Sequence, residues 1–233
     1  MKFLQLDQTK GSFFEYSGIE KEGFSKFESS KGKVSYRKYY EKGINGELES
    51  VSLYDGKFGK QIQLCIRDAE DLNMFQVDLY DQKDHVSTFA EELIKFLPNL
   101  NKGMNLDFNA YNFTPEGEQY AKRGFSLKSN GEKVSRALSN AYYKKEDGTL
   151  VEGDIPAVKW VEKLGKRKPS PASLEEKDDF LLEVVSKETD RLKFVPTSQD
   201  DGASKTEEKP KEKPLKAESF EGSEDEDDDS LPF

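Results

Sequence analysis

Residues 47–67 read ELESVSLYDGKFGKQIQLCIR and decide the fold. Polar and apolar residues alternate over 47–54 and again over 61–67, which is the period of a half-buried β-strand. Residues 55–60, DGKFGK, place two glycines between these runs and predict a tight turn. The segment is therefore expected to form a β-hairpin with one face toward a core.

Further strands are expected on both sides of this hairpin, at residues 34–40, 74–80, 104–113, 120–127 and 132–138. Between the strands at 74–80 and 104–113, apolar residues recur at steps of three and four from Val86 to Leu97. This spacing predicts a helix with one apolar face, capped by Ser87 or Asp84 and ended by Pro98.

Three strands in hairpin succession, a helix and then more strands follow the order of an oligonucleotide-binding (OB) barrel. We therefore expect a mainly β, OB-fold-like five-stranded barrel over residues 33–145, although other small α+β domains share this order. Residues 1–32 are expected to form an N-terminal arm of extended chain or short strands. Residues 146–194 are expected to be an extension with a basic connector and a helix over 174–193, and residues 195–233 a disordered acidic tail.

The composition separates the body of the chain from its tail. The hydrophobic fraction is 34% and the charged fraction 35%, against about 45–50% and about 25% in ordinary globular domains. The net charge is −10, but residues 194–233 hold 13 acids and 5 bases, whereas residues 1–168 hold 26 acids and 27 bases. The acidic total therefore describes the tail, and it does not exclude nucleic-acid binding by the body.

Several functional classes lack their signatures. Cys65 and His85 are the single cysteine and histidine, so neither an intramolecular disulfide nor a Cys/His zinc site is expected. Cys65 lies in an apolar run and is expected to be a buried thiol, whereas His85 lies in a polar turn and is expected at the surface. The acids of residues 68–71 could bind a metal as in a nuclease, but they are more simply a polar loop.

No nucleotide-binding, hydrolase or metalloprotease motif is present, so we expect neither an enzyme nor a cofactor. The sequence also contains no signal-peptide pattern and no apolar run of the roughly 18 residues that span a bilayer. A cytoplasmic protein is therefore expected.

Aromatic and basic residues are interleaved along the body, as a surface that binds single strands without sequence preference requires. The candidate nucleic-acid-binding residues are Tyr36, Arg37, Lys38, Tyr39, Tyr40, Lys57, Phe58, Lys60, Arg67, Tyr111, Phe113, Lys122, Arg123 and Phe125. Each ring could instead pack in the core, and each base could be an ordinary solvated residue. Phe58 is the strongest candidate because a tight turn offers it little core, while Phe108 is expected in the core and Tyr111 and Phe113 on the opposite face.

The tail carries a second signal. Residues 221–229 contain seven acids and no base, and residues 227–233 read DDDSLPF. An apolar hook after a run of carboxylates suits a pocket with an apolar floor and a basic rim. We identify the residues that would contact such a partner as Asp227, Asp228, Asp229, Leu231, Pro232 and Phe233.

This ending resembles that of bacterial and phage single-stranded DNA-binding proteins, which often close on Asp-Asp-Asp-(Ile/Leu)-Pro-Phe; Ser230 is inserted here before the hook. The resemblance covers the tail only. It implies that the tip docks replication or recombination proteins such as a polymerase, helicase or nuclease, while the body coats single-stranded DNA. The body does not visibly match the common bacterial proteins, which favours a phage or otherwise divergent family.

Other functions remain open from the sequence alone. The chain could be an adaptor or DNA mimic whose acidic tail occupies the DNA site of another protein, or a recombination accessory factor that anneals strands; a nuclease ranks last. The basic connector over residues 163–168 could bind phosphates or could receive the acidic tail.

Overall fold

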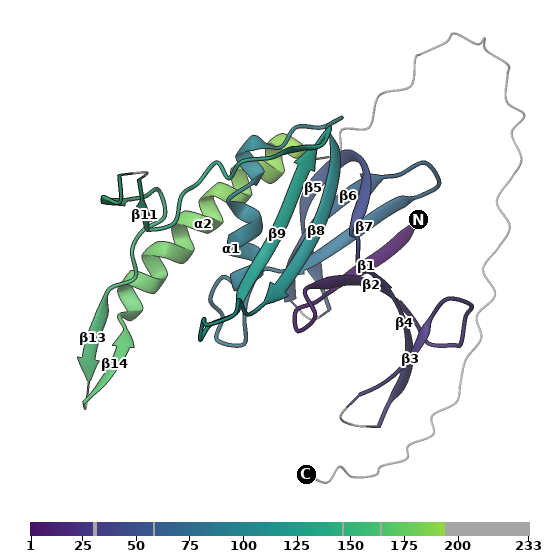
Figure 1. Cartoon of the computed structure of the whole chain (residues 1–233), viewed down its shortest axis with the longest axis horizontal. Helices are drawn as coiled ribbons and strands as arrows, with labels where there is room; N and C mark the ends of the chain where they lie inside the picture. Colours follow the sequence, from purple (N-terminus) through teal and green to yellow (C-terminus); the bar gives the residue numbers. More distant parts are fainter. Residues whose placement is uncertain (30–31, 58, 146, 164, 194–233) are drawn as a thin grey trace, which may run out of the picture. The chain divides into compact units, whose positions relative to one another are not determined.

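A computed structural model describes residues 1–29, 32–57, 59–145, 147–163 and 165–193 of the chain (Figure 1). The chain divides into two units, Met1–Val195 and Pro196–Phe233, and all described residues lie in the first. The predicted disordered tail with its Leu-Pro-Phe tip and the candidate residue Phe58 lie outside the described residues. Within the described part, the helices are too short or too polar to cross a membrane.

The structure is mainly β with two α-helices, as expected. The strands are β1 (Lys2–Asp7), β2 (Ser12–Ser17), β3 (Ser25–Glu28), β4 (Val34–Tyr40), β5 (Ile44–Gly56), β6 (Gly59–Arg67), β7 (Leu72–Asp78), β8 (Asn105–Phe113), β9 (Lys122–Ser129), β10 (Glu132–Lys133), β11 (Tyr142–Lys144), β12 (Leu150–Glu152), β13 (Trp160–Lys163) and β14 (Lys166–Pro169). The helices are α1 (Thr88–Ile94), the 3₁₀ turn η1 (Leu97–Asn99) and α2 (Pro171–Leu192).

The hairpin predicted from residues 47–67 is present as β5 and β6, with Val51 opposite Leu64. A bulge between Leu48 and Ser50 inserts one extra residue in β5 and bends the strand. The predicted helices are also confirmed. Ser87 caps α1 by accepting a hydrogen bond from the Ala90 amide at 3.1 Å, and α2 begins at Pro171, a favoured residue for a first helical turn.

Ten strands form one sheet in the order β10-β9-β8-β5-β6-β7-β1-β2-β4-β3. All neighbours are antiparallel except β1 and β7, which are parallel. The sheet is open, and the described strands do not close into a barrel. The sheet remains open because β1 pairs with the edge of β7 that β6 leaves free. The strands of residues 1–32 therefore belong to the main sheet, and the short-strand interpretation of this segment is correct.

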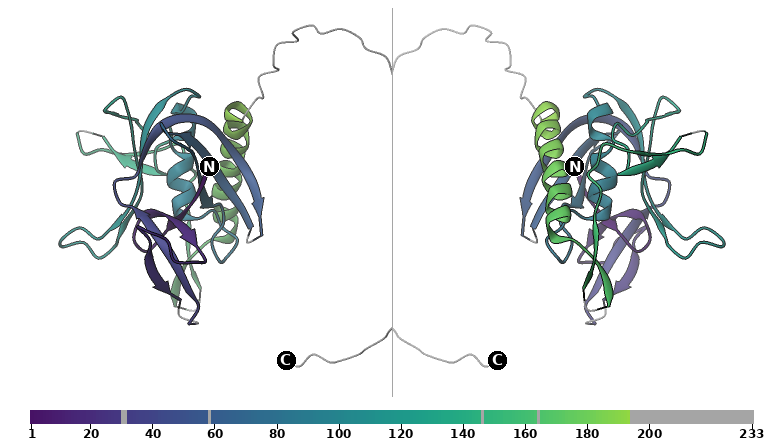
Figure 2. Two further views of the ribbon diagram at one scale, coloured as in Figure 1. Left: turned by 90° about the vertical axis from the view of Figure 1, so that its right-hand side faces the viewer. Right: turned by 90° about the vertical axis from the view of Figure 1, so that its left-hand side faces the viewer.

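A cluster of phenylalanine rings forms the centre of the core. Phe13 lies 4.7 Å from Phe75 and 5.1 Å from Phe108 between ring centroids, and Phe108 lies 5.2 Å from Phe125. These rings come from β2, β7, β8 and β9, so the sheet curls until distant strands share one interior. Phe89 of α1 packs on Phe125 at 5.6 Å, and α2 runs beside α1 (Figure 2).

Candidate nucleic-acid interface

Alternation along β4 divides the densest predicted cluster, residues 36–40, between two faces of the sheet. Arg37 lies opposite Tyr16 of β2, and Tyr39 lies opposite Phe14, so these four side chains share one face. The remaining members point to the opposite face: Tyr36, Lys38 and Tyr40. Residues 36–40 therefore cannot act as a single binding surface.

The face that carries Arg37 extends across the sheet and is called the outer face here, because the ring cluster of the core lies on the other side. The ladder registers place the following residues on it: Phe3, Gln5, Phe14, Tyr16, Arg37, Tyr39, Tyr54, Gln61, Gln63, Met74 and Gln76. Extending the β1–β2 register by one residue sets Phe3 opposite Tyr16. Phe3 is 52% exposed and Tyr16 47%, so two neighbouring rings present surface to solvent.

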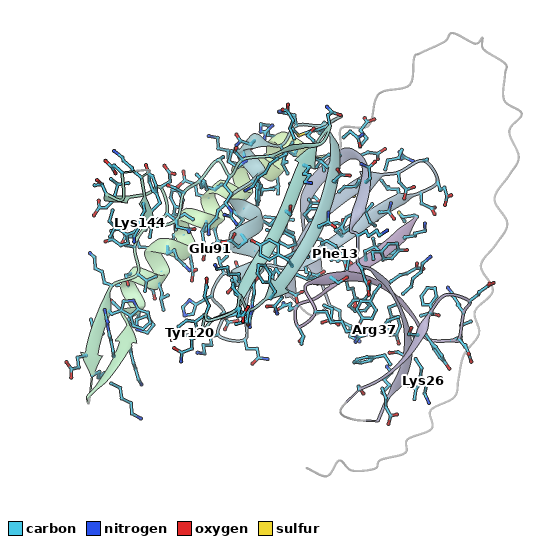
Figure 3. The ribbon with its side chains drawn as sticks, viewed as in Figure 1. Phe13, Lys26, Arg37, Glu91, Tyr120 and Lys144 are labelled. Carbon is cyan, nitrogen blue, oxygen red and sulfur yellow. The ribbon has the colours of Figure 1, made fainter. Side chains whose placement is uncertain are left out.

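Arg37 is held in a stack on the outer face (Figure 3). Its guanidinium lies 3.4 Å from the ring centroid of Phe27 and 4.3 Å from that of Phe14. Asp7 accepts hydrogen bonds from Arg37 Nη1 at 3.3 Å and from the Tyr39 hydroxyl at 2.9 Å. The Arg37 Nε atom is buried and makes no hydrogen bond among the described residues. The planar cation is thus held between rings, and its buried Nε donor is left without a partner among the described residues.

An open cleft of about 420 Å³ lies beside this stack. Its lining combines apolar, aromatic and charged side chains from β1, the β1–β2 turn, β2, β3 and β4: Leu6, Asp7, Gln8, Thr9, Lys10, Phe14, Phe27 and Arg37. Lys10 Nζ sits 3.8 Å from the centroid of the Tyr39 ring. A second cleft of about 300 Å³ is lined largely by amides: Gln5, Leu6, Gln8, Gln61, Gln76 and Asp78.

The β1–β2 turn joins the outer face to β8. The Asn112 side-chain amide donates hydrogen bonds to the carbonyl oxygens of Gln8 at 2.8 Å and Thr9 at 3.1 Å. Tyr111 and Phe113 flank Asn112 on β8, and their ring centroids lie 5.8 Å apart. Arg37 and Tyr111 therefore flank the β1–β2 turn, although they lie more than 70 positions apart in the sequence.

The expected division of β8 between two faces is confirmed. Phe108 is fully buried, whereas Phe113 is 54% exposed. Phe125, in contrast, was predicted to contact nucleic acid, and this is wrong: it is 2% exposed and packs on Phe89 and Phe108. It alternates in phase with the buried Leu127 of β9, so its ring points into the core.

The remaining predicted bases lie at separate places. Lys57 is exposed at the β5–β6 turn, and Lys60 is the second residue of β6, 4.0 Å from Asp55. Three further bases lie on strands, two of them in ion pairs: Arg67 with Glu49, Lys122 with Glu118 at 2.6 Å, and the exposed Arg123. Glu49 raises the pKa of Arg67 further above its usual range. The described members thus spread over both ends of β6 and the start of β9.

The sequence did not identify several residues of the outer face as candidates for binding: Phe3, Tyr16, Gln5, Gln61, Gln63 and Gln76. Residues 2–7 (KFLQLD) and 12–17 (SFFEYS) do not alternate regularly between polar and apolar residues, and no local pattern indicates that these strands join the main sheet. The residues became recognisable as a surface only through the registers of β1 with β2 and β7.

The acidic loop over residues 68–71 is a structural turn. Asp68 accepts hydrogen bonds from the amides of Glu70 and Asp71 at 2.8 and 2.7 Å, and these bonds lower the pKa of Asp68. Asp71 binds the N-terminal ammonium at 2.9 Å and Lys2 at 2.9 Å. Within the described ranges, no group of three potential metal ligands occurs.

The structure confirms the expected environment of Cys65 but differs from that expected for His85. Cys65 is buried as predicted, and burial raises the pKa of its thiol. His85 is not an unattached surface residue, because its Nδ1 lies 2.7 Å from Asp178 Oδ2 of α2. The ring is half-buried and links the α1-side loop to α2.

No family model matches this sequence, and comparisons with curated proteins and with solved structures find no match. A function for the chain must therefore be inferred from its residues and their geometry.

Proposed function

We propose that the chain binds single-stranded DNA without sequence preference and protects it during replication, recombination or repair. The observation that carries this proposal is the outer face, where the exposed rings of Phe3 and Tyr16 lie beside the Arg37 stack and the Lys10 cleft. Stacking of a base on an aromatic ring contributes about 1–3 kcal/mol and is indifferent to base identity. Lysine and arginine supply the phosphate contacts.

The strand order supports an OB-like architecture for this unit. β5 pairs with both β6 and β8, and α1 lies between β7 and β8, as in an OB fold. We propose that β5–β9 with α1 form an OB-like unit opened by β1 at the β7 edge. In OB folds the second and third strands and two loops bind the ligand. Their counterparts here are β6, β7, the turn that holds Lys57 and the loop that holds the 77% exposed Tyr120.

The amides of the second cleft fit the same ligand. Gln5, Gln61 and Gln76 offer both donors and acceptors. Such groups can hydrogen-bond to unpaired bases of any kind, whereas a duplex would present only its groove edges and its phosphates. We therefore propose a preference for single strands over duplex DNA.

We further propose that Leu231, Pro232 and Phe233, with the acids before them, recruit replication or recombination proteins. The support is the sequence resemblance to the tails of single-stranded DNA-binding proteins. A DNA mimic acting through its acidic tail is the alternative. The aromatic and basic surface of the body favours the first function, since a mimic has no use for it.

The proposal is tested by titrating the full chain into fluorescein-labelled oligo-dT at two salt concentrations, beside a duplex of equal length. Tight, salt-sensitive binding to the single strand and weak binding to the duplex is the expected result. A chain lacking residues 221–233 should bind oligo-dT at least as tightly. If neither chain binds, single-strand binding is ruled out and the adaptor function takes its place.

A further inference from the structure

The β13–β14 hairpin projects beyond the N-terminal end of α2 (Figure 1). Its described side chains are all exposed except Pro169, which is half-buried. They include Trp160, the single tryptophan of the chain, at 55% exposure. Two strands of four residues bury too little surface to be stable alone in water, so the position of this hairpin depends on how its base is attached.

The base of the hairpin is tied to α2. The Ser170 amide donates to the Lys159 carbonyl oxygen at 2.8 Å, and the Lys159 amide donates to Ser173 Oγ at 3.0 Å. Ser173 is buried in the first turn of α2, and α2 packs on the core through Leu181 and Val185. The hairpin is thus a fixed extension of the folded unit, although its own side chains contribute little to the core.

Its register gives the hairpin two distinct faces. Trp160 lies opposite Pro169 and Glu162 opposite Arg167, and the Arg167 guanidinium lies 5.6 Å from the Trp160 ring centroid. The other face carries Val161 and three lysines: Lys163, Lys166 and Lys168. With Lys159 and Arg167, the hairpin holds five bases against one acid, and none of the five makes an ion pair within the described part of the chain.

We propose that this hairpin is a second contact for single-stranded nucleic acid, separate from the outer face. One base stacks on Trp160 beside Arg167, and the strand passes around the edge of the two-stranded hairpin, so that Lys163, Lys166 and Lys168 on the other face contact the phosphates. An exposed indole beside a guanidinium offers a stacking platform, and lysines at alternate positions of β14 follow an extended backbone. The inference rests on the proposed function, and it extends the binding path from the sheet to the start of α2.

The single tryptophan makes the test specific to this hairpin. The full chain is titrated with unlabelled oligo-dT while Trp160 emission is followed, and binding is measured in parallel by anisotropy of labelled oligo-dT. Quenching of Trp160 along the same binding curve is expected, because a stacked base quenches an indole. Trp160→Ala should weaken binding by about 5- to 150-fold.

Charge is tested separately with K163Q/K166Q/K168Q. The plot of log affinity against log salt concentration has a negative slope, and loss of three phosphate contacts should reduce the magnitude of this slope by about 2. A matched triple variant neutralises three exposed lysines that lie elsewhere, Lys42, Lys83 and Lys187. It changes the net charge equally and should leave the slope nearly unchanged. Circular dichroism of both variants checks that α2 remains folded.

The outcomes separate the two proposals. Binding by anisotropy without a change in Trp160 emission, or equal slopes for the two triple variants, overturns the hairpin contact and leaves the proposed function intact. Absence of binding overturns both. A peptide of residues 221–233 is titrated as well. If it alters Trp160 emission and oligo-dT does not, the hairpin binds an acidic peptide and the nucleic-acid contact is wrong.

Discussion

Gly11 lies so close to the backbone of Asn112 that a Cβ atom at position 11 would stand 2.0 Å from the Asn112 amide nitrogen. Gly11 also has φ +61°, in the left-handed region that side chains disfavour. Glycine is therefore required twice at this turn, by conformation and by space. The contact sets the Lys10 cleft beside the aromatic pair of β8.

We predict that Gly11→Ala lowers the free energy of unfolding by about 2–5 kcal/mol. About 1–2 kcal/mol arises from the left-handed conformation, and the rest from forcing the turn away from β8. Urea denaturation measures the loss. Gly23→Ala is the matched control, since Gly23 has φ +78° but a methyl group added there would meet nothing within 4 Å. Gly23→Ala should therefore lower the free energy of unfolding only by the about 1–2 kcal/mol that arises from the left-handed conformation. Equal losses in the two variants would show that the turn does not pack tightly on β8.

Phe3→Ala and Tyr16→Ala should each weaken oligo-dT binding by about 5- to 150-fold, because each removes a ring on which a base stacks. Both rings are about half exposed, so the free energy of unfolding should change little. Anisotropy titration at fixed salt gives the affinities. Leu150→Ala removes a similarly exposed apolar side chain, 60% exposed, from the separate β12 strand, and should leave the affinity unchanged. Unaltered binding by both ring variants would exclude the outer face as the interface.

Local patterns predicted those features that depend on neighbouring residues. The alternation of residues 47–67 gave β5 and β6, and the helical spacing after Val86 gave α1. The placement of Tyr111 and Phe113 opposite Phe108 followed from the same two-residue period. In each case burial on one face of one element determines the pattern.

Features that depend on distant pairings could not be predicted in this way. β1 pairs with β7 across some 70 residues, and the residue pattern of neither strand indicates which strand it pairs with. Arg37 is stacked by Phe27 and anchored by Asp7 from two other strands. The error at Phe125 has a different origin, because the cluster of basic and aromatic residues was weighed above the alternation with Leu127.

Arg37→Lys should lower the free energy of unfolding by about 1–2 kcal/mol. A lysine retains the charge near Asp7 but loses the planar stack between Phe14 and Phe27. Lys38→Gln, on the opposite face of the same strand, is the control and should change the value by less than about 0.5 kcal/mol. Urea denaturation of both variants at neutral pH measures the two changes in the free energy of unfolding. A loss no larger than that of the control would mean that the ring contacts do not stabilise β4.

Glu91 of α1 links the two helices, since its carboxylate lies 3.0 Å from Nζ of Lys95, the residue that caps α1, and 3.0 Å from Lys177 Nζ on α2. Burial opposes its ionisation, but the two ammonium groups hold the pKa of Glu91 below its ordinary value. A carboxyl whose pKa is lower in the native state contributes stability above its unfolded pKa, about 4.3, and this contribution is lost as the pH falls through the native pKa.

Glu91→Gln should therefore lower the free energy of unfolding at pH 7 by about 2 kcal/mol. This is less than the about 3–5 kcal/mol lost when a fully buried pair is broken, because the Glu91 side chain keeps 22% of its surface exposed. The difference from the unmodified chain should shrink as the pH falls below about 4.3. Urea denaturation at pH 7, 5 and 3.5, with the exposed Glu183→Gln as control, follows this change. A difference that stays constant with pH would assign the loss to packing, because only an ionised Glu91 can attract both lysines.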